Sequence, residues 1–313
     1  MLQLADGKQP RPGVLRRAGW LLTLWILMSA AMPAAVAAPV TFNTALPVSQ
    51  GEALLRLQAK YLRATDDPGP MDRKLTVTAV PLVGAWGVTS RWTLFAIVPW
   101  VDKRLATDTP MGRISRDANG LGDVTAIARY TAFAKDAPGR TFRVAPFAGI
   151  ETPSGSDDER DGLGELPRPL QPGSGSWDPS IGVVITDQSL DREWGADASY
   201  KFNRQADGFE FGDEARLNVS YHARIVTAGP AGGIPHFIYA GLEGNLLWQD
   251  KNRSRGANDP DSGGTTVYLA PVLQYVTMRT VTGAAVQIPV VQDLNGDALA
   301  RDFIATLSLR INF

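Results

Sequence analysis

Cysteine is absent from the 313 residues of this chain, and histidine occurs only at His222 and His236. Without cysteine the chain has no disulfides, no thiolate metal sites and no thiol nucleophile. Ser220 precedes His222 by two residues on one face of a strand-like stretch. The two side chains are then about 7 Å apart by the strand repeat, beyond direct hydrogen-bond reach. We therefore expect that the protein is not an enzyme.

An excess of charge of one sign and long apolar runs are also missing. Lys and Arg number 31 against 32 Asp and Glu, which gives a formal net charge of −1. A nucleic-acid partner would require a clustered basic face, which the sequence does not have. Beyond the amino-terminal region, no apolar run approaches the roughly 20 residues of a membrane-spanning helix. The sequence thus predicts neither a nucleic-acid partner nor a helical membrane span.

The amino-terminal region has the order of a secretory signal peptide. Arg16 and Arg17 precede the apolar run "AGWLLTLWILMSA", which is followed by "AMPAAVAA". Ala35-Val36-Ala37 matches the small-residue pattern of a cleavage site, and the run is too short for a membrane anchor. We predict a signal peptide over residues 1–37. The mature chain, 38–313, then carries 27 Lys and Arg against 31 Asp and Glu, a net charge of about −4.

The mature sequence alternates apolar and polar residues with a period of two, the pattern of half-buried strands. The last stretch, "RDFIATLSLRINF", places Phe303, Ala305, Leu307, Leu309, Ile311 and Phe313 on one face. The opposite face is polar except for Ile304. The stretches "EWGADASYKF" and "EARLNVSYH" repeat the pattern. The fold class is therefore all-β.

About twelve such segments follow one another, with boundaries uncertain by two to four residues. They cover residues 52–64, 73–86, 91–101, 121–133, 140–151, 177–186, 192–203, 209–223, 236–249, 264–275, 279–290 and 300–313. No linker divides them, so residues 38–313 form one domain. Connections alternate between short turns, such as "GVTSR" and "VTMR", and long loops, such as "DKRLATDTPMGRISRDANG". Short turns on one side and long loops on the other are typical of outer-membrane β-barrels.

The two faces of the strands separate a barrel from a soluble sandwich. The apolar faces are rich in Ala, Leu and Val, and aromatic residues stand near strand ends: Trp92, Trp100, Tyr130, Trp194, Tyr200, Tyr221, Trp248 and Tyr275. Aromatic girdles at both edges of an apolar band mark lipid interfaces. The polar faces interleave both charge signs, as a watery lumen allows. Candidate lumen residues are Arg56, Lys60, Arg129, Arg143, Asp197, Lys201, Glu214, Arg216, Glu243 and Arg310. We predict a single antiparallel transmembrane β-barrel in a bacterial outer membrane, closed because no sheet edge survives in lipid.

Several stretches resemble a known family. "GLGDV" (Gly120 to Val124), "PSGSDDERDGLGELPRPLQPGSGSWDPSIGV" and "GVTSRWTLFAIVPW" are similar to the family labelled "putative MetA-pathway of phenol degradation", whose members are often called outer-membrane transporters. The resemblance covers roughly residues 50–313 and is sharpest at 120–182. It implies an outer-membrane barrel, sometimes associated with the catabolism of aromatic compounds. It implies no catalytic mechanism and no set of functional residues.

The segment Glu151–Pro179 is the longest of the predicted loops. Its Pro, Gly and Ser content fits a disordered surface segment, but Leu163, Leu166 and Leu170 are more apolar anchors than a solvated loop needs. We predict that it folds over or into the barrel mouth as an ordered constriction. The residues expected to select solutes there, or to anchor the loop, are Asp157, Asp158, Glu159, Arg160, Asp161, Arg168 and Trp177.

The same loop has part of the spacing of a calcium site. Asp157, Glu159 and Asp161 occupy positions 1, 3 and 5 of such a loop, but position 12 is Arg168 instead of a bidentate Glu. We expect a solvated loop, with no metal and no cofactor.

Two functions fit these features. The first is an outer-membrane channel or transporter for small solutes, with aromatic and other hydrophobic compounds as candidates. The second is a structural or interaction barrel of the envelope with a plugged interior and no transport. Twelve strands leave a narrow lumen, which suits either. The expected partners are outer-membrane lipid, a small-molecule solute and, through the aromatic carboxyl terminus Phe313, the outer-membrane assembly machinery.

Overall fold

The computed structural model describes residues 37–229 and 235–313. Most of the predicted signal peptide lies outside these residues, so its cleavage stays a prediction. Within them the chain is almost entirely β-strand, with one 3-10 turn, η1 (Arg168–Leu170). No helix in this part of the chain is long and apolar enough to cross a bilayer.

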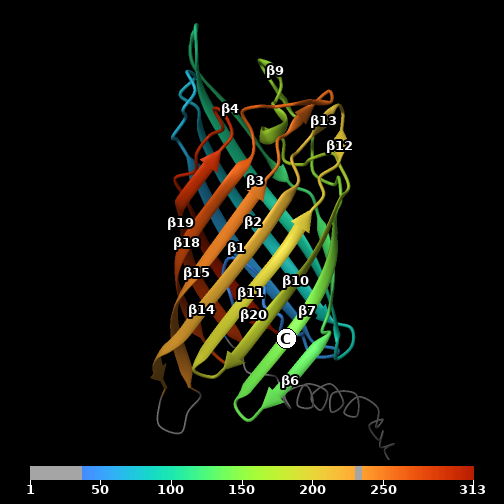
Figure 1. The fold of residues 1–313 in the computed structure, drawn as a ribbon, viewed down its shortest axis with the longest axis vertical. Helices are drawn as coiled ribbons and strands as arrows, with labels where there is room; N and C mark the ends of the chain where they lie inside the picture. The colour runs from blue at the N-terminus through green and yellow to red at the C-terminus, as the bar shows by residue number, and fades with distance from the viewer. Residues whose placement is uncertain (1–36, 230–234) are drawn as a thin grey trace, which may run out of the picture. The chain divides into compact units, whose positions relative to one another are not determined.

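Twelve antiparallel strands of the described chain form a closed ring (Figure 1). Each pairs with the next in sequence. The ring closes because the first strand pairs with the last, Arg56 opposite Arg310. The wall strands are β1 (Ala53–Ala64), β2 (Lys74–Gly87), β3 (Trp92–Thr109), β5 (Thr125–Tyr130), β7 (Arg140–Glu151), β10 (Asp178–Ser189), β11 (Arg192–Lys201), β14 (Glu214–Ala228), β15 (His236–Gln249), β18 (Gly264–Val276), β19 (Thr280–Leu294) and β20 (Phe303–Asn312).

The remaining strands are short additions at the two ends of the barrel. β4 (Gly112–Leu121) pairs with the upper part of β3, and β6 (Phe133–Ala137) pairs with β7. Two-residue strands lie within three of the long connections: β8 (Arg160–Asp161), β9 (Gly164–Glu165), β12 (Gln205–Ala206), β13 (Phe209–Glu210), β16 (Arg253–Ser254) and β17 (Ala257–Asn258). We call the end with β9 and β13 the long-loop end and the end with β6 and the carboxyl terminus the short-turn end (Figure 1).

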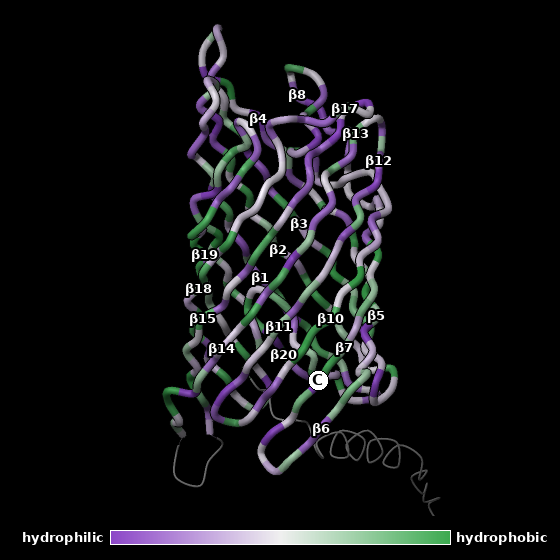
Figure 2. Tube along the Cα trace, in the orientation of Figure 1, coloured by the Kyte–Doolittle hydropathy of each residue, from purple (hydrophilic) through white to green (hydrophobic). Residues whose placement is uncertain are grey.

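Alternation along each strand separates an inner from an outer face. In β18 the even positions from Thr266 to Val276 are buried, whereas Leu269, Leu273 and Tyr275 are exposed. The outer face is therefore a continuous apolar belt, and polar residues gather in the long connections (Figure 2). A soluble protein rarely exposes so large an apolar surface, whereas lipid covers it at no cost.

Exposed aromatic side chains lie at both edges of this belt. Trp194 stacks against Tyr221 at the short-turn end, with ring centroids 4.3 Å apart. Trp248 and Trp100 are exposed toward the long-loop end. Indole and phenol rings favour the boundary between lipid and water, so these residues mark the thickness of the membrane-embedded wall. The predicted transmembrane barrel is confirmed.

One predicted loop is wrong. Residues 102–120 form a hairpin: β3 continues to Thr109, and β4 returns from Gly112, whose positive φ of 113° lets the chain reverse. The sequence did not predict strands here because the outer face of the hairpin is polar and its inner face mixes polar with apolar residues, such as Leu105 and Ala118. The hairpin extends past the apolar belt, where neither face contacts lipid, so the period-two signal disappears. The strand predicted at 121–133 accordingly divides into the end of β4 and the short β5.

Candidate functional site

The lumen at the short-turn end is filled by residues 38–48, which we call the lumenal segment. Ala38, Val40, Phe42, Ala45 and Val48 are all buried in it. It packs against opposite sides of the wall. Val40 contacts Val272 and Ala285, on β18 and β19, and Ala45 contacts the inward-facing residues Ala145, Val184 and Phe147, on β7 and β10.

The segment is held by side chains of the wall and adds no strand to the sheet. Among the described residues, none of its backbone groups bonds to another backbone group. Its amides donate to side-chain oxygens instead: Ala45 N lies 2.8 Å from Thr186 Oγ1, and Val48 N lies 3.3 Å from Thr93 Oγ1. No backbone ladder therefore joins the segment to the wall.

Glu243 accepts hydrogen bonds from two amides of the segment, including the shortest one. Val40 N donates to Oε1 at 2.7 Å and Thr41 N to Oε2 at 2.9 Å, and the Thr41 hydroxyl also donates to Oε2. Hydrogen bonds to an ionised carboxylate are about twice as strong as neutral ones. Glu243 therefore anchors the segment to β15.

His222 holds Glu243 in position. Its Nε2 lies 3.1 Å from Glu243 Oε1 and its Nδ1 lies 2.7 Å from Glu193 Oε2, with all three side chains fully buried. We call these three residues the carboxylate latch. Gly241 faces His222 across the strand pair, and a Cβ there would collide with the imidazole. Ser220 Oγ donates to Glu193 at 3.3 Å, so the same acid holds both groups.

Arginine side chains receive the carbonyls of the segment. Arg129 donates to the carbonyls of Thr44 and Leu46, the latter at 2.6 Å. Arg56 donates to three carbonyls of residues 39–42. Arg56 stands directly opposite Arg310, and like charges in such pairs repel. The carbonyl dipoles of the lumenal segment thus offset part of the positive charge that these arginines place at the short-turn end of the lumen.

All ten candidate lumen residues lie on the inner face of the described wall. Arg56, Arg129 and Glu243 bind the segment, and Arg143 pairs with Asp136 of β6 at 2.7 Å. Asp197 accepts a hydrogen bond from Asn218, and Glu214 pairs with Arg216 at 2.5 Å. Within the described chain Lys60 has no ion pair or hydrogen-bond partner, and its neighbours Arg56 and Arg216 are cationic. The middle of the lumen is therefore positively charged.

At the long-loop end, residues 152–177 fold inward; we call them the mouth loop. Leu166 and Leu170 are buried against Leu105 and Leu75 on the inner face of β3 and β2. Lys103 of β3 donates to the carbonyls of Pro169 and Gln171, at 3.1 and 2.6 Å. The loop closes on itself at a neck, where Gly173 N donates to the carbonyl of Ser156 at 2.7 Å.

The predicted constriction residues occupy different places. Asp157 pairs with Arg168 at 3.0 Å, and Arg168 also binds Asp207 of the next long connection at 2.9 Å. Asp161 binds Arg116, whose hydrogen bonds lower the pKa of the Asp161 carboxyl. The carboxylates with calcium-like spacing are thus separated by arginines.

Three of these residues are exposed, and one contributes mainly its backbone. Asp158 and Arg160 are exposed, and the amide and carbonyl of Glu159 bond to the buried Gln171. Trp177 is 59% exposed and precedes inward-facing Asp178, so strand alternation turns its ring outward. This places Trp177 with the outer aromatic residues, and its role in the constriction stays a prediction.

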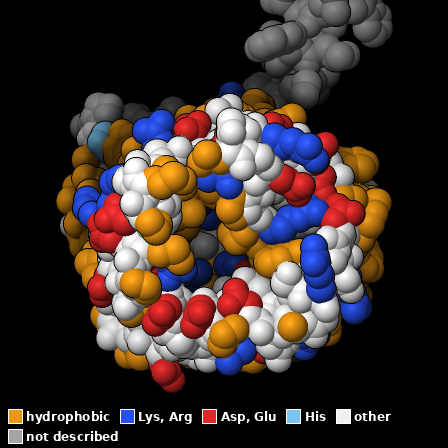
Figure 3. Space-filling model, turned by 90° about the horizontal axis from the view of Figure 1, so that it is seen from above, with side chains coloured by type: hydrophobic (Ala, Val, Ile, Leu, Met, Phe, Trp, Pro, Cys, Tyr) orange, Lys and Arg blue, Asp and Glu red, His pale blue; other side chains and the backbone are white. Residues whose placement is uncertain are grey.

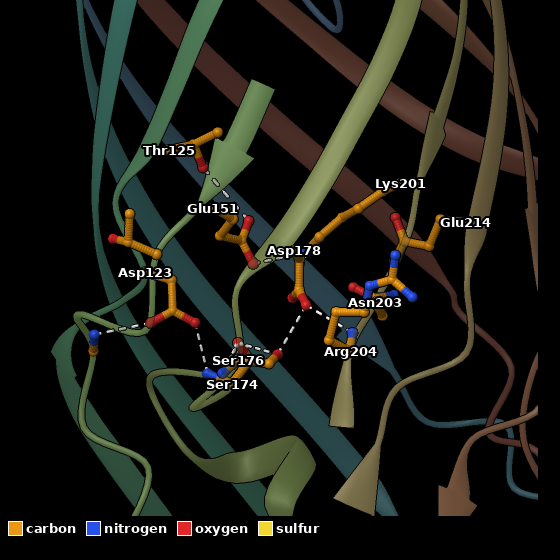
Figure 4. A network of polar contacts seen from close by, with 12 residues as sticks. Asp123, Thr125, Glu151, Ser174, Ser176, Asp178, Lys201, Asn203, Arg204 and Glu214 are labelled. Atoms are coloured by element: carbon orange, nitrogen blue, oxygen red, sulfur yellow. Dashed lines mark hydrogen bonds and ion pairs between the residues drawn. The ribbon is translucent and has the colours of Figure 1, made fainter. Parts of the chain in front are cut away.

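A polar cavity of about 290 Å³ lies between the mouth loop and the wall. Its ionisable lining is four carboxylates and two ammonium groups: Asp123, Glu151, Asp178, Glu214, Lys103 and Lys201 (Figure 4). Seen from the long-loop end, the molecule is hollow at its centre, with side chains of both charge signs around the opening (Figure 3). Charge in the lumen is therefore divided into an acidic upper cavity and a cationic middle.

The family model matches residues 74–289, more than half of the chain. The chain belongs to the family described as "Putative MetA-pathway of phenol degradation". The matched residues include the carboxylate latch, the mouth loop and the polar cavity, whereas the lumenal segment precedes them. No curated protein matches the chain.

Solved structures with this fold are outer-membrane barrels. The chain is similar to the COG4313 outer membrane channel from Pseudomonas putida F1, with a TM-score of 0.63 and 13% identity over 86% of this chain and 98% of that one. The NanC porin follows with a TM-score of 0.45 and 12% identity, covering 83% of this chain and 100% of that one. This member of the phenol-degradation family is therefore an outer-membrane β-barrel embedded in the lipid bilayer.

The lumenal segment was missed from the sequence. The stretch "APVTFNTALPV" has two prolines and no strand-length alternation, so no pattern assigned it to the wall or to the lumen. The only feature that could have identified the segment was its place in the sequence, between the predicted cleavage site and the first predicted strand. Glu193 and His222 were also missed as latch residues, since cross-strand neighbours depend on register.

Proposed function

We propose that the protein is an outer-membrane channel for small solutes, with aromatic and other hydrophobic compounds as candidates, and that solutes pass along the lumen when the lumenal segment leaves it. The observation that carries the proposal is the way the segment is attached. Side chains alone bind residues 38–48, and their carbonyls and amides can be hydrated when they leave.

The charged inner face supports a passage for polar or charged groups. Lys60 and Arg216 face the lumen between the segment and the acidic cavity, where an apolar filling would be expected in a purely structural barrel. Twelve strands enclose a narrow lumen, so the solutes would be small. Long loops face the exterior and short turns face the periplasm, as in other outer-membrane barrels. The exposed Phe313, which pairs with Ala53, is then available to the assembly machinery from the periplasm.

The proposed function involves no catalysis. His222 is the one described histidine inside the lumen, and both of its ring nitrogens are engaged by carboxylates. Ser220 donates to Glu193 and has no bond to His222. A serine nucleophile needs its base within hydrogen-bond reach, and this arrangement does not provide one.

The second candidate is a plugged structural barrel, which the presence of the lumenal segment in the short-turn end favours. Liposome swelling distinguishes the two. Proteoliposomes that contain the purified mature chain should swell in arabinose and in benzenesulfonate faster than protein-free liposomes, and should not swell faster in a large oligosaccharide. If neither small solute enters faster than in protein-free liposomes, the protein is a plugged barrel and the channel proposal is wrong.

A further inference from the structure

The polar cavity beneath the mouth loop contains one buried carboxylate oxygen that accepts no hydrogen bond in the described chain. Asp178 is 1% exposed, and its Oδ1 accepts hydrogen bonds from Ser176 Oγ and Arg204 N, both at 2.8 Å. Its Oδ2 is buried and accepts no hydrogen bond. The nearest cation is Lys201 Nζ at 3.6 Å, which is bound more closely to Glu151 at 2.7 Å.

The other charged groups of the cavity already have partners. Asp123 accepts from the amides of Gly155 and Ser174, at 2.8 and 2.6 Å, and so holds the neck of the mouth loop. Glu214 pairs with Arg216. Lys103 is committed to two loop carbonyls. The four acids exceed the two lysines by two charges, and Arg216 offsets one of these at Glu214, so Asp178 Oδ2 lies in a region that favours a cation.

Four of the other lining residues are apolar. Pro99, Val101, Pro172 and Phe211 surround the same cavity and offer a surface for a compact hydrocarbon body. Ligand sites in proteins combine an apolar lining with a few placed polar groups. A buried carboxylate oxygen without a donor is costly, and a donor on a ligand removes that cost.

We propose that this cavity binds a small organic ammonium ion, with its N–H donating to Asp178 Oδ2 and its apolar body against Pro99, Val101, Pro172 and Phe211. The inference rests on the proposed function, because the cavity lies at the outer mouth of the same lumen, and it names a ligand held at that mouth. The site lies on the long-loop side of Lys60 and Arg216, whose positive charge would hold an ammonium ion above the middle of the lumen. The cavity therefore captures its ligand at the outer mouth.

Binding can be measured without transport, by isothermal titration of the purified full barrel in detergent. The probes are benzylammonium, benzyl alcohol as its neutral counterpart and benzoate as an anion. The wild type should bind benzylammonium and bind the other two at least about tenfold more weakly, since a charge-assisted hydrogen bond is lost. Equal binding of all three probes, or none of benzylammonium, overturns the proposal.

Two variants test whether benzylammonium binds at this cavity. Asp178→Asn keeps the shape of the side chain and removes its charge, and Val101→Phe fills the apolar side without touching Asp178. Each should weaken benzylammonium binding about tenfold or more. The control variant Asp158→Asn, which changes an exposed acid of the mouth loop, should leave benzylammonium binding unchanged. Heat-resistant barrel migration on gels verifies that each variant is folded. If benzylammonium binding is unchanged in both folded variants, the proposed site is wrong. Binding without liposome swelling would refute the channel alone, and swelling without binding would refute this site alone.

Discussion

Deletion of residues 38–48 from the mature chain should raise single-channel conductance in planar bilayers severalfold. The segment occupies the short-turn end of the lumen and makes no backbone bond to the wall, so the barrel should still assemble. Its removal also takes away the carbonyls that Arg56 and Arg129 bind. The widened opening would then be lined by cations, and the current should become more anion-selective.

Asn43→Ala is the matched control for this deletion. Asn43 is the exposed member of the segment and makes no hydrogen bond in the described structure, so its truncation should leave conductance unchanged. Heat-modifiable migration on gels verifies that the deleted form is a folded barrel. If the folded deletion variant has wild-type conductance, the ions do not flow through the part of the lumen that the segment occupies.

Glu243→Gln should increase the frequency with which the channel opens and leave the conductance of the open state as it is. The carboxylate accepts bonds from two amides and one hydroxyl of the segment. An amide side chain turns an NH₂ group toward at least one of these donors, so a charge-assisted bond worth about 1.5–3 kcal/mol is lost. That loss corresponds to an increase of roughly tenfold or more in the population of the released segment.

Glu214→Gln is the control for this substitution. Glu214 is a carboxylate on the same inner face, but it pairs with Arg216 and makes no contact with the segment. Single-channel recordings should show wild-type opening frequency for Glu214→Gln and a higher frequency for Glu243→Gln. Equal opening frequencies in the two variants would mean that the latch does not govern release.

The wall of the barrel could be predicted from the sequence because lipid imposes a strict pattern on it. In the membrane, a wall strand keeps an apolar outer face along its length, and its inner face is mostly polar. The stretch predicted at 264–275 is accordingly β18, Gly264–Val276. The hairpin of β3 and β4 lost that pattern where it passed beyond the belt, and it was predicted as a loop.

The contacts inside the lumen could not be predicted in the same way. Alternation assigns Glu243 to the inner face but does not say which residue lies opposite it. His222 reaches Glu243 because the register of β14 and β15 places it beside Gly241, where no side chain competes for the space. Trp177 was assigned to the mouth because it ends a loop. Its exposure follows from strand parity, which a one-residue shift reverses.

A reversible lock on the lumenal segment tests the central claim most directly. The chain has no cysteine, so Ala45→Cys with Thr186→Cys introduces the only two thiols, at positions where the Ala45 amide and the Thr186 hydroxyl are 2.8 Å apart. Oxidation should fix the segment in the lumen and abolish arabinose-driven liposome swelling. Reduction should restore swelling to the rate of the Ala45→Cys single variant. If fully cross-linked barrels, verified by their gel mobility, swell as fast as reduced ones, the segment does not gate the lumen.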